Sequence, residues 1–157
     1  MILLWGLSSD GPLAAAEAAL ARRGAPVFHL DQQRTAETSI DLRMDETELA
    51  GEMQVGAGRC ALDEVGGVYV RAYDTRAVLE EGAGEALTAH AALLETTVQA
   101  FVEATSAKVV NPAAAMATNG SKPYQAALIS RHGFLTPATL VTTDPAEALA
   151  FRARHGQ

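Results

Sequence analysis

The stretch that decides the fold of this chain is Asn111–Thr142, which reads NPAAAMATNGSKPYQAALISRHGFLTPATLVT. Asn111-Pro112 ends the apolar run Val109-Val110, because proline fixes φ and asparagine supports turns. The alanine-rich segment that follows predicts a short helix, and Asn119–Ser121 is a polar break that can cap a second helix. Pro123 falls in the first turn of that second helix, where a missing N–H costs little.

The second half of the stretch ends this helix and begins a strand. Gly133 follows Arg131-His132, two basic residues placed favourably at the negative end of the helix dipole. Pro137 starts the extended run Thr139–Thr142, for which we predict a β-strand. The whole stretch therefore connects one packing unit to the beginning of another.

Length and composition limit the class of protein. The 157 residues can form one domain with a real core, or one domain and the beginning of another, and 48% of them are hydrophobic, as in a globular protein. The net charge is −7 without a Lys/Arg cluster, which argues against a nucleic-acid partner. Cys60 is the single cysteine, so one chain can build neither a disulfide nor a thiolate metal site. We expect it to be a half-buried strand residue rather than a reactive thiol.

The chain carries no signal for secretion or membrane insertion. Met1–Gly6 is too short for a secretory core and lacks a basic flank. Its apolar runs stay well below the ~20 residues that span a bilayer. We therefore expect a soluble, cytoplasmic protein without a membrane partner.

The N-terminal part predicts a βαβ unit. Ile2–Trp5 is a continuous apolar run, as in a strand buried on both faces of a parallel sheet. Pro12 opens a helix that ends at Gly24, and Pro26–Leu30 forms the second strand. The connecting loop Ser8–Gly11 lies beyond the carboxyl end of a strand, where α/β proteins bind ligands.

This unit does not carry a dinucleotide-binding fingerprint. Gly6 and Gly11 lack the G-x-G-x-x-G spacing. Asp31 follows the second strand and could bind a ribose, but it also closes a strand as any turn aspartate does. A structural loop that lines a cleft is the interpretation we favour over nucleotide binding at this position.

In the middle of the chain the hydrophobic period changes to two. Ile40, Leu42 and Met44 alternate with polar residues, and Gly56–Gly58 predicts a hairpin turn. Glu46–Ala50 is compatible with one helical turn. We interpret this region as a small antiparallel insertion in the βαβ pattern.

Arg71 ends the next buried strand, Val65–Arg71. A guanidinium at such a strand end can bind a carboxylate or phosphate in two-pronged fashion. The alternative is an ion pair with a nearby acid, such as Asp10 or Asp74. Residues that follow strand ends are our candidates for substrate binding, namely Ser8, Asp10, Arg71 and Tyr73.

The longest helical signal is Glu85–Ser106, with an apolar stripe at spacings of three and four. His90 lies beside this stripe without a partner at metal spacing, so we expect a boundary histidine rather than a ligand. Lys108–Asn111 is the last strand of the first sheet. The final helix is Pro145–His155, which Asp144 caps. One strand and one helix cannot bury a core of their own, so we expect the sequence to belong to a longer protein.

The order of these elements resembles that of the ATP-grasp ligases. In that family a small Rossmann-like domain precedes the nucleotide-binding domains, and the linker has the form Asn-Pro…Asn-x-x-Lys…Gly-x-x-x-Pro-x-Thr. The matching positions here are Asn111, Pro112, Asn119, Lys122, Gly133, Pro137 and Thr139. The hairpin followed by Val65–Arg71 is similar to the branch of RimK-like enzymes and ribosomal-peptide maturases.

The resemblance implies an α/β fold, with a Rossmann-like, mostly parallel sheet flanked by helices and carrying a small antiparallel hairpin insertion. It implies a pre-ATP-grasp domain at residues 1–111, a helical linker at 112–137, and the first strand and helix of a truncated ATP-grasp domain at 138–157. Such ligases join a carboxylate to an amine through an acyl-phosphate. The full-length parent would use ATP and Mg²⁺.

Lys122 is the one nucleotide contact that the resemblance implies here, and a solvated surface lysine is the alternative. Catalytic residues and metal ligands are expected beyond Gln157, so this chain alone should bind no cofactor and should be inactive.

The expected partners are the missing C-terminal ATP-grasp domains, and carboxylate and amine substrates such as amino acids or peptides. The unpaired last strand should dock on the first domain or pair with a second copy in a homodimer. The alternative function is a free-standing Rossmann-like module that binds a small ligand or a partner protein.

Overall fold

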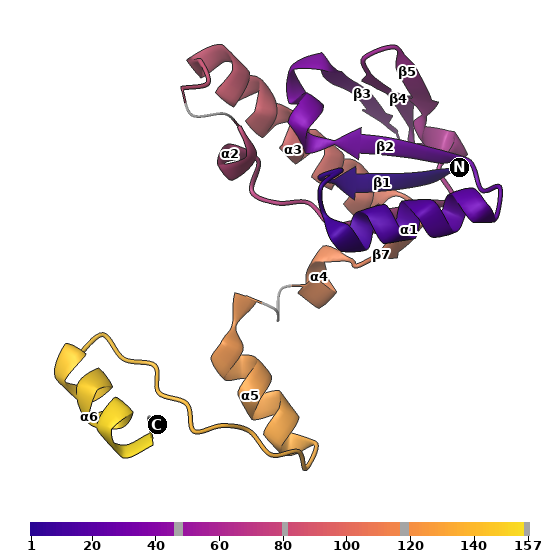
Figure 1. The fold of residues 1–157 in the computed structure, drawn as a ribbon. Coiled ribbons are helices and arrows are strands. Elements are labelled where there is room, and N and C mark those ends of the chain that lie inside the picture. The colour runs from indigo at the N-terminus through magenta and orange to yellow at the C-terminus, as the bar shows by residue number, and fades with distance from the viewer. Residues whose placement is uncertain (46–48, 80–81, 117–119, 156–157) are drawn as a thin grey trace. The chain divides into compact units, whose positions relative to one another are not determined.

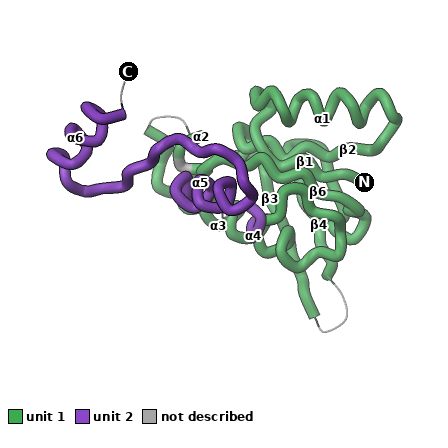
Figure 2. Tube along the Cα trace, turned by 90° about the horizontal axis from the view of Figure 1, so that it is seen from below, with its two compact units in different colours: residues 1–112 green, residues 113–157 purple. Residues whose placement is uncertain are grey.

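The computed structural model describes residues 1–45, 49–79, 82–116 and 120–155. Its contacts divide the chain into two compact units, residues 1–112 and residues 113–157, which Figure 2 colours separately. The elements of unit 1 are β1 (Ile2–Gly6), α1 (Gly11–Arg22), β2 (Val27–Asp31), the 3-10 helix η1 (Gln32–Glu37), β3 (Thr38–Met44), β4 (Leu49–Val55), β5 (Gly58–Ala61), the 3-10 helix η2 (Leu62–Glu64), β6 (Gly67–Val70), α2 (Thr75–Val78), α3 (Glu85–Ala104) and β7 (Lys108–Val110). The elements of unit 2 are α4 (Ala113–Met116), α5 (Lys122–Arg131) and α6 (Pro145–His155).

A parallel sheet in the order β2-β1-β6-β7 forms the centre of unit 1 (Figure 1). The continuous apolar run of β1 suits a central strand, because both faces of the sheet are covered. Leu3 and Leu4 are both fully buried, and they point to opposite faces because side chains alternate along a strand. α1 covers one face and α3 covers the other (Figures 1 and 2). The α/β fold class that the sequence predicted is confirmed.

A second, antiparallel sheet in the order β3-β4-β5 lies on the α3 side. Gly56-Ala57 joins β4 to β5, and Gly56 has a φ of +57°, a conformation that favours glycine. The predicted hairpin insertion and its turn are therefore confirmed. The helical turn expected at Glu46–Ala50 is wrong at its end, because Leu49 already pairs with β3 as the first residue of β4. Residues 46–48 lie outside the described residues.

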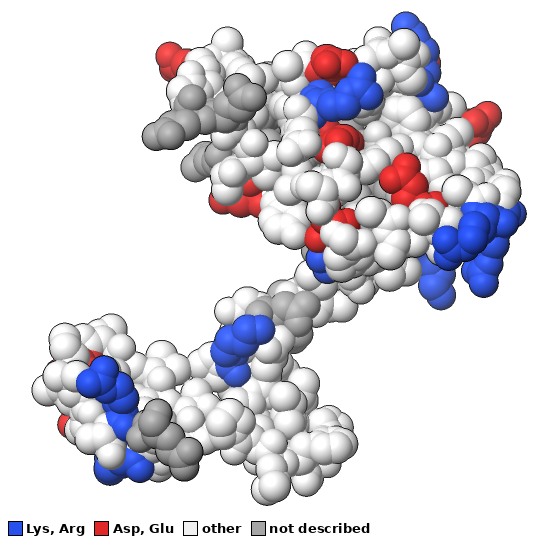
Figure 3. Space-filling model, in the orientation of Figure 1, with Lys and Arg blue, Asp and Glu red and all other residues white. Residues whose placement is uncertain are grey.

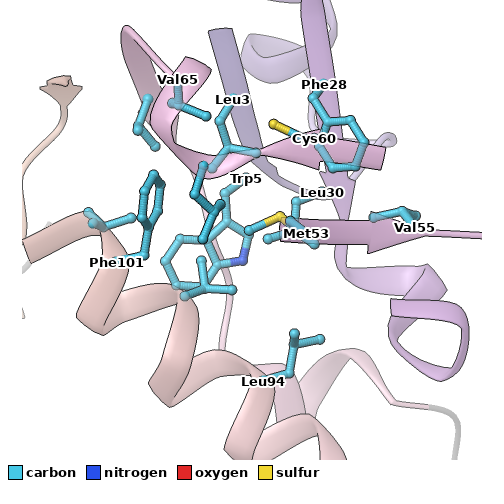
Figure 4. Packing of buried hydrophobic residues seen from close by; sticks show 14 residues of the cluster. Leu3, Trp5, Phe28, Leu30, Met53, Val55, Cys60, Val65, Leu94 and Phe101 are labelled. Carbon is cyan, nitrogen blue, oxygen red and sulfur yellow. The ribbon is translucent and has the colours of Figure 1, made fainter. Parts of the chain in front are cut away.

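Side chains from both sheets and from α3 form one hydrophobic core. Figure 4 shows Phe101 and Leu94 of α3 pointing toward Trp5 of β1 and Met53 of β4. The predicted stripe of α3 supplies the buried residues Ala91, Leu94, Val98, Phe101 and Val102. Cys60 is buried in this core, and burial raises the pKa of its thiol, so the thiol is protonated and acts as a packing group.

His90 joins α3 to the small sheet. Its Nε2 atom lies 2.9 Å from the carbonyl oxygen of Thr38, the first residue of β3, and donates a hydrogen bond to it. The interpretation of His90 as a boundary histidine is confirmed. α3 ends at Ala104, slightly before the predicted end at Ser106, because Thr105 adopts an extended backbone and caps it.

Unit 2 contains the predicted helices but lacks the predicted strand. α5 begins after Ser121, whose hydroxyl accepts a hydrogen bond from the Tyr124 N–H at 3.4 Å, and Pro123 lies in the first turn as expected. Asn119 lies outside the described residues. The strand expected at Thr139–Thr142 is wrong, because the described part of unit 2 offers no second strand to accept its hydrogen bonds. α6 covers the predicted range.

None of the described helices is long and apolar enough to cross a lipid bilayer.

Candidate functional site

A cluster of three polar side chains lies at the carboxyl edge of the parallel sheet. Asp10 follows β1, and Arg71 and Tyr73 follow β6, the neighbouring strand. Arg71 donates to both carboxylate oxygens of Asp10, from Nε to Oδ2 at 3.0 Å and from Nη2 to Oδ1 at 2.8 Å. Tyr73 donates its hydroxyl to Oδ1 of Asp10 at 2.9 Å. These three residues are called the Asp10 cluster below.

Local backbone structure places Asp10 and Arg71. Asp10 is the N-cap of α1, and its Oδ2 accepts a hydrogen bond from the Leu13 N–H at 2.9 Å. Arg71 extends the parallel ladder, because its N–H donates to the Trp5 carbonyl oxygen at 2.8 Å. Gly6 permits this close approach, since a Cβ at that position would lie 2.9 Å from the Arg71 carbonyl oxygen.

Electrostatics keep the cluster in one protonation state. The hydrogen bonds from Arg71, together with those from the Leu13 N–H and Tyr73, hold the pKa of Asp10 well below its usual range. The pKa of Arg71 is raised by its hydrogen bonds to Asp10, and the pKa of Tyr73 is raised by its own hydrogen bond to Asp10. At neutral pH the cluster therefore contains a carboxylate, a guanidinium and an un-ionised phenol.

Burial gives the members of the ion pair different roles. The Asp10 side chain is 4% exposed, whereas that of Arg71 is 32% exposed. Asp10 occupies the Nε and Nη2 side of the guanidinium, and Nη1 has no hydrogen-bond partner among the described residues. The ion pair with Asp10, which was the alternative interpretation of Arg71, is confirmed. The Asp10 carboxylate is covered by its partners, whereas Nη1 of Arg71 faces no described partner and could donate to an oxyanion. Asp10, Arg71 and Tyr73 as substrate contacts remain predictions.

The remaining predicted site residues lie apart from these contacts. Ser8 is exposed in the turn between β1 and α1, and no hydrogen bond joins its side chain to the described part of the cluster. Lys122 is the first residue of α5 in unit 2, and its Nζ donates to Oε1 of Gln125 at 3.2 Å. Ser8 as a substrate contact and Lys122 as a nucleotide contact both remain predictions.

Two buried polar residues next to the cluster were missed by sequence reasoning. Gln32, the residue after β2, is 5% exposed, and Thr75, the first residue of α2, is 4% exposed. Gln32 Nε2 donates to the Tyr73 carbonyl oxygen at 2.8 Å, and Gln32 Oε1 accepts from the Tyr73 N–H at 2.9 Å. Nε2 also donates to Thr75 Oγ1 at 3.3 Å. The available signal was the position of Gln32, which follows a strand end as the predicted site residues do.

A groove of about 610 Å³ opens beside Gln32. It lies between η1 and described residues on either side of positions 80–81. Its described walls include Gln32, Gln33, Thr35, Val78, Leu79 and Leu87. This mixture of amide, hydroxyl and aliphatic groups suits an amphipathic ligand such as a peptide segment.

Figure 3 shows the charged side chains on one face of unit 1. Acidic and basic groups both occur there, and basic side chains gather at the right-hand edge of this view.

Several solved structures share the fold of this chain. One is macrocyclase MdnC from Microcystis aeruginosa, bound with precursor peptide MdnA (TM-score 0.80, 21% identity, covering 98% of this chain and 49% of that chain). A second is a RiPP-associated ATP-grasp ligase from Chryseobacterium gregarium in complex with ADP and a leader and core peptide (TM-score 0.71, 18% identity, 98% and 47%). A third is ATP-grasp ligase PsnB, complexed with a phosphomimetic variant of its minimal precursor, Mg and ADP (TM-score 0.62, 23% identity, 99% and 52%).

These matches establish the fold of the chain. The chain spans about half the length of the three proteins that it matches. No protein-family model matches the sequence, and no curated protein matches it significantly. The resemblance to the N-terminal portion of an ATP-grasp ligase, drawn from the linker pattern, is therefore confirmed at the level of the fold.

Proposed function

We propose that this chain is the N-terminal, substrate-side portion of an ATP-dependent carboxylate–amine ligase that acts on peptides. The observation that carries the proposal is the fold match over 98% of the chain to about half of two peptide-bound proteins, a macrocyclase and an ATP-grasp ligase. The linker pattern from Asn111 to Thr139 supports it independently, and the hairpin favours the RimK-like and peptide-maturase branch. The protein would work in the cytoplasm.

The reaction assigns different tasks to the two parts of the complete enzyme. ATP would transfer its γ-phosphoryl group to a substrate carboxylate, and an amine would then displace phosphate to form the amide. Mg²⁺ and cationic groups must neutralise the transferred phosphoryl group. In this chain Lys122 is the candidate nucleotide contact, and the further cofactor contacts would come from C-terminal ATP-grasp domains. The chain alone would be inactive.

The Asp10 cluster provides the proposed substrate-facing edge. Arg71 presents a guanidinium edge that Asp10 holds in one orientation, so binding an oxyanion there loses little side-chain entropy. Tyr73 lies beside it with 46% of its surface exposed, and Ser8 is exposed on the preceding turn. The natural ligand of such an edge is a carboxylate of the peptide substrate.

The surface of unit 2 supports the proposed need for further domains. None of its described residues is buried, and several large apolar side chains are exposed, including Leu135 at 100%, Phe134 at 70% and Val141 at 72%. An apolar surface of this kind requires cover. C-terminal ATP-grasp domains would supply it, and a homodimer is the alternative that light scattering of the chain would detect.

The decisive experiment compares this chain with the product of the complete reading frame. We expect the longer protein to consume ATP and to remove water from a peptide substrate, as seen by mass spectrometry, and we expect the 157-residue chain to do neither. Full activity in the short chain, or a reading frame that stops at Gln157, would overturn the proposal.

The second candidate function is that of a free-standing ligand-binding module. It is supported by the hydrophobic core of unit 1, which is formed by residues of that unit alone. A free-standing ligand-binding module should respond to peptides, amino acids or nucleotides in a titration of the isolated chain. The changes should map to Ser8–Asp10 and Arg71. A flat titration with all three ligand classes would exclude this function.

A further inference from the structure

Gln32 lies beyond the carboxyl end of β1, the strand that separates β2 from β6 in the parallel sheet. β1 runs between β2 and β6 and ends at Gly6, after which the chain turns away toward Asp10. Beyond that point no ladder joins the end of β2 to residues 71–74, all of which the structure describes. The Gln32 side chain spans this gap, because it follows β2 directly and bonds to the backbone of Tyr73.

The bonds made by Gln32 reproduce one rung of a β-ladder. A side-chain amide has a donor and an acceptor placed like those of a backbone peptide, and Gln32 uses both on a single residue, Tyr73, at 2.8 and 2.9 Å. Its Nε2 makes a second contact with Thr75 Oγ1, and its own carbonyl oxygen accepts from Thr35 Oγ1 at 2.8 Å. A buried amide with these contacts has one available orientation.

The position of the Tyr73 backbone depends on its two hydrogen bonds to the Gln32 side chain. Residues 71–74 have no regular secondary structure, and Ala72 has no backbone hydrogen bond from its N–H among the described residues. The phenol reaches Asp10 only if the Tyr73 backbone is held at the correct distance from the sheet edge. Arg71 is fixed separately, through its N–H bond to Trp5.

We propose that Gln32 is a positioning residue, which holds Tyr73 so that its hydroxyl closes the Asp10 cluster and leaves the outer edge of Arg71 open to a ligand. Gln32 acts through Tyr73 and does not itself contact the ion pair. Gln32 also lines the groove beside η1, so this residue connects the groove to Tyr73 of the cluster. The role of the cluster in this inference rests on the proposed function, but the experiment below measures a phenol rather than ligation, so the two can fail separately.

The test follows the ionisation of Tyr73 by ultraviolet absorbance. The chain has three tyrosines, so the background carries Tyr69→Phe and Tyr124→Phe, and only Tyr73 titrates. In this background the pKa of Tyr73 should lie above its ordinary value of 10.0, because the phenol donates to the Asp10 carboxylate. Gln32→Met keeps a side chain of similar size but removes both hydrogen bonds to Tyr73 and the one to Thr75, so it should return the pKa of Tyr73 toward 10.0.

Two variants separate positioning from general stability. Thr75→Val removes one partner of Gln32 but leaves the Tyr73 rung intact, so the pKa of Tyr73 should stay raised. Gln33→Met changes the next, exposed residue and should also leave it raised. A raised pKa of Tyr73 in a folded Gln32→Met variant would overturn the proposal, as would an equal fall in all three variants.

Hydrogen exchange of the unsubstituted chain provides a readout that does not depend on whether Gln32→Met folds. The Tyr73 amide should exchange at least tenfold more slowly than the Ala72 amide, because only Tyr73 donates to Gln32. Equal exchange of these two adjacent amides would show that the rung does not hold Tyr73, and the proposal would be wrong.

Discussion

Replacing Gly6 with alanine tests how the sheet edge places Arg71. A Cβ at Gly6 would lie 2.9 Å from the Arg71 carbonyl oxygen and 3.2 Å from its carbonyl carbon and Cβ. The nearest of these is a backbone atom, which cannot rotate away as the end of a side chain can. Gly67, in the adjacent strand β6, is the matched control, because a Cβ there would meet its nearest atoms at 3.8 and 3.9 Å, an ordinary contact distance.

The two substitutions should change the free energy of unfolding in opposite directions. Overpacking of this kind costs about 1–3 kcal/mol. Alanine also restricts the unfolded chain, which stabilises the protein by about 0.4–1 kcal/mol where the native backbone accepts it. Gly6→Ala should therefore destabilise unit 1 by a net ~1–2 kcal/mol. Gly67→Ala lacks the clash, so it should stabilise unit 1 by roughly 0.4–1 kcal/mol.

Urea unfolding followed by tryptophan fluorescence measures this difference. Trp5 is the single tryptophan, it is 4% exposed, and it precedes Gly6. With a slope of about 2 kcal/mol/M, Gly6→Ala should lower the midpoint by roughly 0.5–1 M and Gly67→Ala should raise it slightly. Equal shifts in the two variants, or an unchanged midpoint for Gly6→Ala, would refute the close approach of Arg71 to β1.

Three further predictions follow from the same contacts. The pKa of Asp10 is lowered in the folded state, so the ionised Asp10 carboxylate stabilises the fold fully above its ordinary pKa of 3.8. This stabilisation is lost as the pH falls toward the lowered pKa. Acid unfolding curves should therefore be steeper for the wild type than for Asp10→Asn. Phe101→Ala empties a fully buried site in the core, and chemical denaturation should show a loss of about 3–5 kcal/mol. Arg59→Ala removes an exposed ion pair with Glu52, whose side chains are 63% and 47% exposed, and the same assay should show a change below about 1 kcal/mol.

The sequence predicted unit 1 well because its signals are local. The strand β1 is a continuous apolar run, and α3 carries a buried stripe with helical spacing. The contact between Asp10 and Arg71 was also predictable from the sequence, because both residues follow strands of one parallel sheet. The carboxyl ends of neighbouring parallel strands lie at the same edge of the sheet. The position of each residue along its strand was sufficient to suggest the contact.

The sequence could not predict features that depend on residues distant in the chain. Thr139–Thr142 has strand composition, but a strand exists only when another strand accepts its hydrogen bonds. Gln32 follows Asp31 at a strand end, where a polar residue normally forms a turn, and nothing in its local sequence shows that β1 stops short beside it. Its bonds to Tyr73 cross 41 residues of sequence.

The two units differ in where their stability must come from, and this difference decides how the protein should be studied. Unit 1 buries its own apolar side chains between two sheets and two helices, so its folding and its Asp10 cluster can be measured in this chain. Unit 2 buries none of its described residues, and helices of its length are marginal in water without packing. We therefore expect the amides of α5 and α6 to exchange rapidly in the isolated chain and slowly in the product of the complete reading frame. Rapid exchange in both proteins would contradict the proposal that further ATP-grasp domains cover this surface.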